Sequence, residues 1–122
     1  MKEKPQNIQE RAFHFAVRVV KLCIQLDGQP GVPRTLVNQL LRSGTSIGAN
    51  LEEGIGAQSE ADYLTKVSIA CKEVRETLFW LKLLATTEIV PEERLAGIAD
   101  ECNQLVAILT ATAKRLKERC YA

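Results

Sequence analysis

The sequence predicts an all-α protein, and three observations carry that prediction. Apolar residues recur every three or four positions along nearly all of the 122 residues, which is typical of amphipathic helices. No segment alternates apolar and polar residues as a half-buried strand would. The prolines lie in the first few residues or in short breaks, and short connections make neighbouring helices antiparallel. We expect one domain over residues 1–122, an up-down-up-down antiparallel four-helix bundle, with helices near 8–27, 34–56, 60–86 and 91–118.

The first helix has a wide apolar face. One stripe repeats at spacings of four and three and consists of Ile8, Ala12, Phe15, Val19, Leu22 and Leu26. A second set widens it, namely Phe13, Ala16, Val20 and Cys23. This pattern indicates an amphipathic helix with a wide apolar face. The segment from Asp27 to Pro33 contains two glycines and two prolines, which end the helix.

The second helix is unusual because it contains Gly44 and Gly48, four residues apart on one stripe. A glycine inside a helix costs about 1 kcal/mol relative to alanine. Close approach of another helix backbone at these two positions is the compensation that we expect.

The third and fourth helices carry clear starting signals. Ser59 followed by Asp62 resembles a capping box, and Pro91 with the acids after it suits a first helical turn. The expected core row of the third helix is Tyr63, Val67, Ala70, Val74, Thr77 with Leu78, and Leu81. A neighbouring row mixes acids with large apolar residues, as a subunit interface or the edge of a bundle does: Ile69, Glu73, Glu76, Trp80 and Leu83.

The composition limits the classes of function that the protein can have. The formal net charge is only +1, so nucleic-acid binding would need a local cluster of charge. His14 is the only histidine, and no nucleophile, nucleotide-binding or metal-binding motif is present. The four cysteines form no closely spaced pair, and Cys23, Cys71 and Cys102 fall on apolar stripes, which fits buried thiols in a reducing cytoplasm. We expect Cys120 to be exposed. No secretory signal or membrane span is apparent, so we expect a cytoplasmic protein without a cofactor or a bound metal.

One polar row on the second helix stays open to two interpretations. Arg42, Ser46, Asn50 and Glu53 lie on one side of a helix otherwise rich in apolar and small residues. They form either a solvated face or a hydrogen-bonded network that fixes the register of helices or subunits. A remote third interpretation is acid–base catalysis by Glu53 with the carboxylates of the third helix.

The same residues resemble a known family. Arg42 and Ser43, then Ser46 and Ile47, then Asn50, and finally Glu53 and Gly54 resemble the central motif of the four-helix bundle proteins encoded in intervening sequences of bacterial 23S ribosomal RNA. The likeness extends to Lys72-Glu73, Glu76-Thr77 and Trp80-Leu81 in the third helix and to Glu101-Cys102-Asn103 in the fourth. Leu51 and Glu52 depart from the usual Ile-Ala of the motif.

The resemblance implies a ring-shaped homopentamer without enzymatic activity. A distantly related branch serves as the accessory variability protein of diversity-generating retroelements, where it contacts nucleic acid and a reverse transcriptase. The resemblance favours structural or assembly roles for the motif and its neighbours, which are Arg42, Gly44, Ser46, Gly48, Asn50, Glu53, Glu73, Glu76 and Trp80.

The expected function is therefore that of a non-enzymatic, RNA-associated or scaffolding oligomer. The cations at the start of the first helix and the end of the fourth should share one end of the bundle. The nucleic-acid-binding residues that we predict are Lys2, Lys4, Arg11, Arg18, Lys21, Lys114, Arg115, Lys117 and Arg119. The alternatives are a protein-interaction module without a nucleic-acid role and an accessory protein to a reverse transcriptase. We expect no membrane or small-molecule partner.

Overall fold

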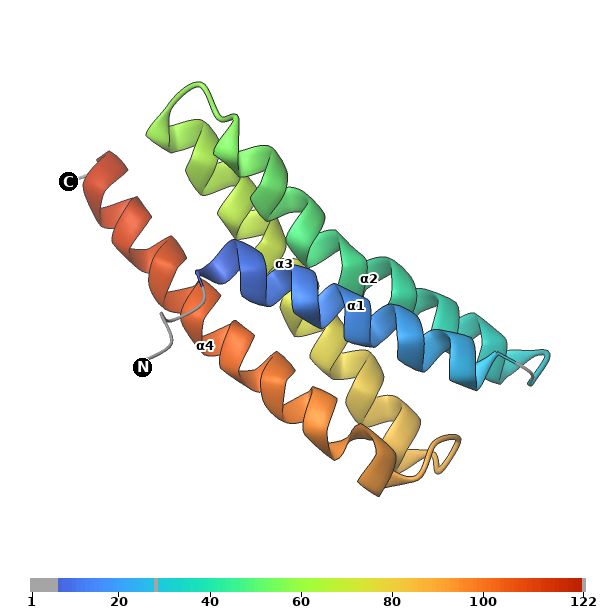
Figure 1. The fold of residues 1–122 in the computed structure, drawn as a ribbon. Coiled ribbons are helices and arrows are strands. Elements are labelled where there is room, and N and C mark those ends of the chain that lie inside the picture. Colours follow the sequence, from blue (N-terminus) through green and yellow to red (C-terminus); the bar gives the residue numbers. More distant parts are fainter. Residues whose placement is uncertain (1–6, 28, 122) are drawn as a thin grey trace, which may run out of the picture.

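The computed structural model describes residues 7–27 and 29–121. In this part of the chain four helices form and no strand does: α1 (Ile8–Leu26), α2 (Val32–Ile55), α3 (Glu60–Thr86) and α4 (Glu92–Tyr121). Successive helices run in opposite directions (Figure 1). Each helix packs against the next, and α1 also approaches α4, whereas neither diagonal pair of described helices comes close. The predicted all-α, four-helix fold is confirmed.

Local hydrogen bonds explain where the helices begin. The Asn7 side chain accepts a hydrogen bond from the Glu10 amide at 2.8 Å, and Ser59 Oγ accepts one from the Asp62 amide at 3.1 Å. The Asp62 carboxylate in turn accepts from the Gln58 amide at 3.2 Å, one residue earlier than in a standard capping box. Gly31, with a φ of 84°, precedes α2 in a left-handed conformation that suits glycine.

One continuous apolar core lies between the four helices. Its largest fully buried side chains come from every helix and include Phe15, Leu40, Ile47, Leu81 and Leu105. Burial of these side chains is the main favourable contribution to folding.

The core row of α3 differs from the predicted one. The buried residues are Leu64, Val67, Ala70, Val74, Thr77, Leu81 and Leu84, whereas Tyr63 and Leu78 are only partly buried. Helix α3 has apolar side chains on several of its faces, because it packs against both α2 and α4. It also carries Phe79, which is exposed. Periodicity alone therefore placed the first core position at Tyr63 instead of Leu64, included Leu78 beside Thr77, and missed Leu84.

None of the described helices is long and apolar enough to cross a membrane.

Candidate assembly and nucleic-acid interface

The two glycines of α2 face α1. A Cβ atom added at Gly44 would lie 2.9 Å from both methyl carbons of Val19. One added at Gly48 would lie 3.4 Å from the backbone oxygen of Ala12. The predicted close approach of another helix at these positions is thus what the structure shows, and α1 is that helix.

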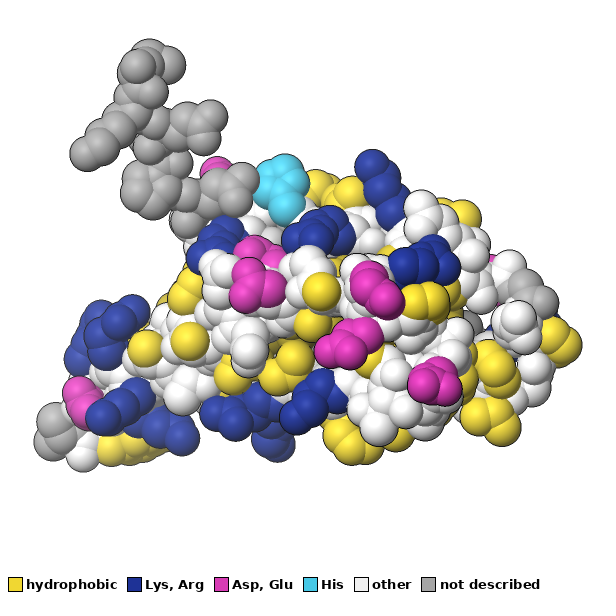
Figure 2. Space-filling model, turned by 90° about the horizontal axis from the view of Figure 1, so that it is seen from below, with side chains coloured by type: hydrophobic (Ala, Val, Ile, Leu, Met, Phe, Trp, Pro, Cys, Tyr) yellow, Lys and Arg dark blue, Asp and Glu magenta, His cyan; other side chains and the backbone are white. Residues whose placement is uncertain are grey.

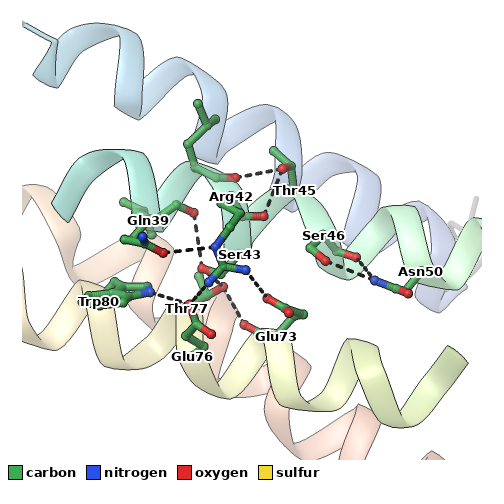
Figure 3. A network of polar contacts seen from close by, with 12 residues as sticks. Gln39, Arg42, Ser43, Thr45, Ser46, Asn50, Glu73, Glu76, Thr77 and Trp80 are labelled. Carbon is green, nitrogen blue, oxygen red and sulfur yellow. Dashed lines mark hydrogen bonds and ion pairs between the residues drawn. The ribbon is translucent and has the colours of Figure 1, made fainter. Parts of the chain in front are cut away.

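A polar network joins α2 to α3 along the surface of the bundle (Figure 3). Arg42 forms ion pairs with Glu73, at 3.2 Å, and with Glu76. Its Nε donates to Gln39 at 3.1 Å, and Trp80 Nε1 donates to the Glu76 carboxylate at 2.9 Å. The Arg42 side chain is 49% exposed and that of Glu73 is 20% exposed. In the single chain this network is therefore half-buried, with one side open to solvent.

Beneath the network lies a fully buried pair of hydroxyl groups. Thr77 Oγ1 donates to Ser43 Oγ at 2.9 Å, and both residues are completely buried. Ser43 Oγ also lies 3.5 Å from the carbonyl oxygen of Leu40. These bonds satisfy groups that would be costly to bury alone, and they fix α2 against α3.

The remaining polar residues of the α2 motif contact one another or the neighbouring helix α3. Asn50 Nδ2 donates to the Ser46 carbonyl oxygen at 2.9 Å and to its hydroxyl at 3.1 Å. Glu53 pairs with Lys66 of α3 at 2.8 Å, and this carboxylate raises the pKa of Lys66. Their predicted roles in assembly stay predictions, because the contacts that they make are within one chain.

The predicted basic residues do not all lie together. Arg11 pairs with Glu101 at 2.9 Å and also donates to Gln104, and the guanidinium of Arg18 lies over Gly97 of α4. Gly97 is 17 residues before Lys114, or about 25 Å along a helix. The first turns of α1 therefore meet the middle of α4, which is the longer helix at 30 residues against 19.

The end of α4 gathers the other described cations. Lys114, Arg115 and Lys117 are exposed, and no ion pair joins them to an acid within residues 7–27 and 29–121. Arg119 pairs with Glu60. Figure 2 shows several basic side chains at this end of the molecule, and others along its length among the acidic ones. Lys2 and Lys4 lie outside the described residues, and Lys21 is exposed on α1.

The sequence reasoning missed two apolar surfaces. Phe13, Val20 and Ile24 on α1 are 64%, 39% and 69% exposed, although the pattern places two of them beside the core stripe. On the opposite side of the bundle, Phe79 of α3 is 56% exposed. The signal was the breadth of the apolar face of the first helix, which exceeds what one neighbouring helix can cover.

The buried thiols are poor nucleophiles at neutral pH. Burial raises the pKa of Cys23 to about 11 and is the main cause that raises the pKa of Cys102 to about 12. Cys71 and Cys120 are partly exposed, and all four cysteines are free. The sequence pattern had placed Cys71 in the core as well. Among the described residues no group of three or more His, Cys, Asp or Glu side chains is arranged to hold a metal ion.

The fold and its surfaces define a class of protein: an all-α bundle with a half-buried polar network, exposed apolar faces and one basic end. Residues 4–111 match the model of the 23S rRNA-intervening sequence protein family, and the chain belongs to that family. It is also similar to the crystal structure of a protein of unknown function from the S23 ribosomal protein family of Bacteroides thetaiotaomicron. The TM-score is 0.81 at 38% sequence identity, and the match covers 88% of this chain and 99% of that one. None of the curated proteins matches the chain.

Proposed function

We propose that this family member is a non-enzymatic helix bundle that assembles into a ring-shaped homopentamer and presents its basic helix ends to RNA. The observation that carries the proposal is the apolar surface of α1, where Phe13 and Ile24 are more than half exposed. Exposed apolar patches of this kind mark protein contacts. A second copy of the chain is the partner that is present wherever the protein is made.

Assembly is what turns a weak basic surface into an effective one. The end of α4 offers three exposed cations, Lys114, Arg115 and Lys117, that make no ion pair among the described residues. A formal net charge of +1 argues against strong binding by one chain. A ring repeats the three cations at every helix end, so that a long polyanion meets several copies at a high effective concentration.

Two further observations favour a scaffolding role and not catalysis, and the cysteines favour a reducing cytoplasm. Arg42 forms ion pairs with Glu73 and Glu76, the carboxylates that acid–base chemistry would need. The thiols of Cys23 and Cys102 have a raised pKa, and free cysteines fit a reducing compartment.

The test is a binding titration with a fluorescent structured RNA and with duplex DNA, each at 50 and 200 mM salt. If about six phosphates are contacted, affinity should fall roughly a thousandfold between these concentrations. The triple variant Lys114→Glu, Arg115→Glu, Lys117→Glu should lose binding and keep its oligomeric mass. Arg34→Glu is the control, because it makes the same change of charge at the other end of the bundle. Lys117→Glu should weaken binding more than Arg34→Glu.

A protein-interaction module is the second candidate, and the exposed apolar surface of α1 favours it, because a helix of another protein could pack there as well. Absence of binding to either polymer at 50 mM salt would overturn the RNA part of the proposal and leave this candidate.

A further inference from the structure

Two apolar surfaces with opposite charge lie on opposite sides of the bundle. The first, the α1/α2 groove, has a volume of about 600 Å³ and is lined by Glu10, Phe13, Ala16, Thr45, Ala49 and Glu52, among others. The second, the α3/α4 face, is lined by Arg75, Leu78, Phe79, Lys82, Leu83 and Val106, among others. Because the helices pack in the cyclic order α1, α2, α3, α4 without diagonal contacts, the α1/α2 and α3/α4 seams lie on opposite sides.

The charged residues of one surface are opposite in sign to those of the other. The charged residues that line the groove are Glu10 and Glu52, whereas those that line the α3/α4 face are Arg75 and Lys82. No ion pair within the described ranges engages any of these four. A symmetric contact of either surface with its own copy would place like charges together, which is unfavourable.

The side chains also match in size. Small residues, Ala16, Thr45, Gly48 and Ala49, form part of the groove lining. Phe79 stands out from the opposite face with 56% of its surface exposed. A large aromatic side chain that enters a groove of small residues is the usual anchor of a protein interface.

We propose that the α1/α2 groove of one copy receives the α3/α4 face of the next, with Phe79 in the groove and Arg75 and Lys82 opposite Glu10 and Glu52. This inference rests on the homo-oligomer of the proposed function and specifies its interface. Such a contact is head-to-tail, because it joins two different surfaces of the same chain. Repeated from copy to copy, it generates a ring when the rotation closes.

The experiment uses two variants, each with one defective surface. The groove-defective variant carries Phe13→Asp and Ala49→Asp, and the face-defective variant carries Phe79→Asp and Lys82→Glu. All four residues are exposed, so the bundle should still fold, and circular dichroism with thermal melting checks this. Val32→Asp is the matched control, because Val32 is 68% exposed and belongs to neither surface.

Each variant alone should be a monomer by light scattering after gel filtration, and an equal mixture should form a 1:1 dimer and nothing larger. In the mixture, one intact groove meets one intact α3/α4 face, and the chain of contacts then stops. The control should keep the wild-type mass.

Two other outcomes have separate meanings. The head-to-tail interface would be wrong if the folded face-defective variant had the mass of the wild-type oligomer. It would also be wrong if the mixture of the two variants stayed monomeric while the wild type formed an oligomer, and in both cases the oligomer itself would remain supported. A wild-type chain that is monomeric at every concentration would overturn the oligomer itself, and the interface with it.

Discussion

Helix α1 contacts its two neighbours in different ways. Against α2 it packs closely, since a Cβ atom at Gly44 would lie only 2.9 Å from the methyl carbons of Val19, and one at Gly48 would touch the backbone oxygen of Ala12 at 3.4 Å. Against α4 it is held by long polar side chains, chiefly the 2.9 Å ion pair between Arg11 and Glu101. Small residues therefore determine which neighbour α1 approaches, and the wider α1/α4 seam relies on side chains that reach across it.

The largest expected effect comes from filling the close seam. Gly44→Leu should lower the free energy of unfolding by about 3 kcal/mol, because overpacking costs 1–3 kcal/mol and the β-branched Val19 cannot turn aside easily. Urea denaturation measures the change. Gly48→Ala is the matched control: its Cβ would make ordinary contacts at 3.4 Å and longer, so it should be neutral or stabilising. Equal losses in both variants would contradict the distinction between the two glycines.

The second-largest effect should come from alkaline pH, which lowers the stability of the close contact between α1 and α2. The pKa of Cys23, whose Sγ lies 3.8 Å from the carbonyl oxygen of Val37 in α2, is raised by burial from 9.0 to about 11. The thiol of the unfolded chain loses its proton first, so stability is complete below pH 9 and declines as pH rises toward 11. The decline is about 1 kcal/mol per pH unit for this thiol. Urea midpoints at pH 8, 9 and 10 should fall less steeply in Cys23→Ala than in the wild type. Parallel slopes would show that another group is responsible.

The wider seam should respond less to mutation. Arg11→Met removes the pair with Glu101 and should cost about 1 kcal/mol, because both side chains are partly exposed and solvent screens the interaction. Arg18→Met is its control on the same helix and should change stability by no more than a few tenths of a kcal/mol, because Arg18 makes no ion pair among the described residues. Thermal melting at low and high salt compares them. A larger loss for Arg18→Met would mean that packing and not charge holds the seam.

The smallest effect should have the opposite sign. Gly97→Ala in α4 should stabilise the protein by up to about 1 kcal/mol, because alanine favours the helix. The new Cβ would meet only the end of the flexible Arg18 side chain, at 3.2 Å. Gly44→Ala, the same substitution on the close seam, should destabilise. Thermal melting of the two alanine variants tests the comparison directly, and a shared sign would contradict it.

Much of this fold could be predicted from the sequence. The spacing of Ala12, Phe15 and Val19 identified the core stripe of α1, and Ser59 marked the start of α3. Gly44 and Gly48 indicated where a neighbouring helix comes close. Each of these signals is local, so it is visible in a single segment of the chain.

The contacts between helices could not be predicted in the same way. Lys72 lies at the right spacing to pair with Glu76, yet Arg42 of another helix takes that carboxylate. Arg11 had been grouped with the end of α4, yet it meets Glu101 in the middle of that helix, because the two helices differ in length. The apolar stripe beside the core gave no means of telling that Phe13 is exposed while Cys23 is buried.

The proposed assembly adds a third contact to the comparison, because the α1/α2 groove would lie between two copies. Native mass spectrometry of the wild-type chain over a range of concentrations measures how many copies assemble. We expect a species of five times the 13.5 kDa of one chain, which dissociates when Phe13 or Phe79 is replaced by aspartate. A wild-type chain that has the mass of a single copy at every concentration would contradict the proposed assembly.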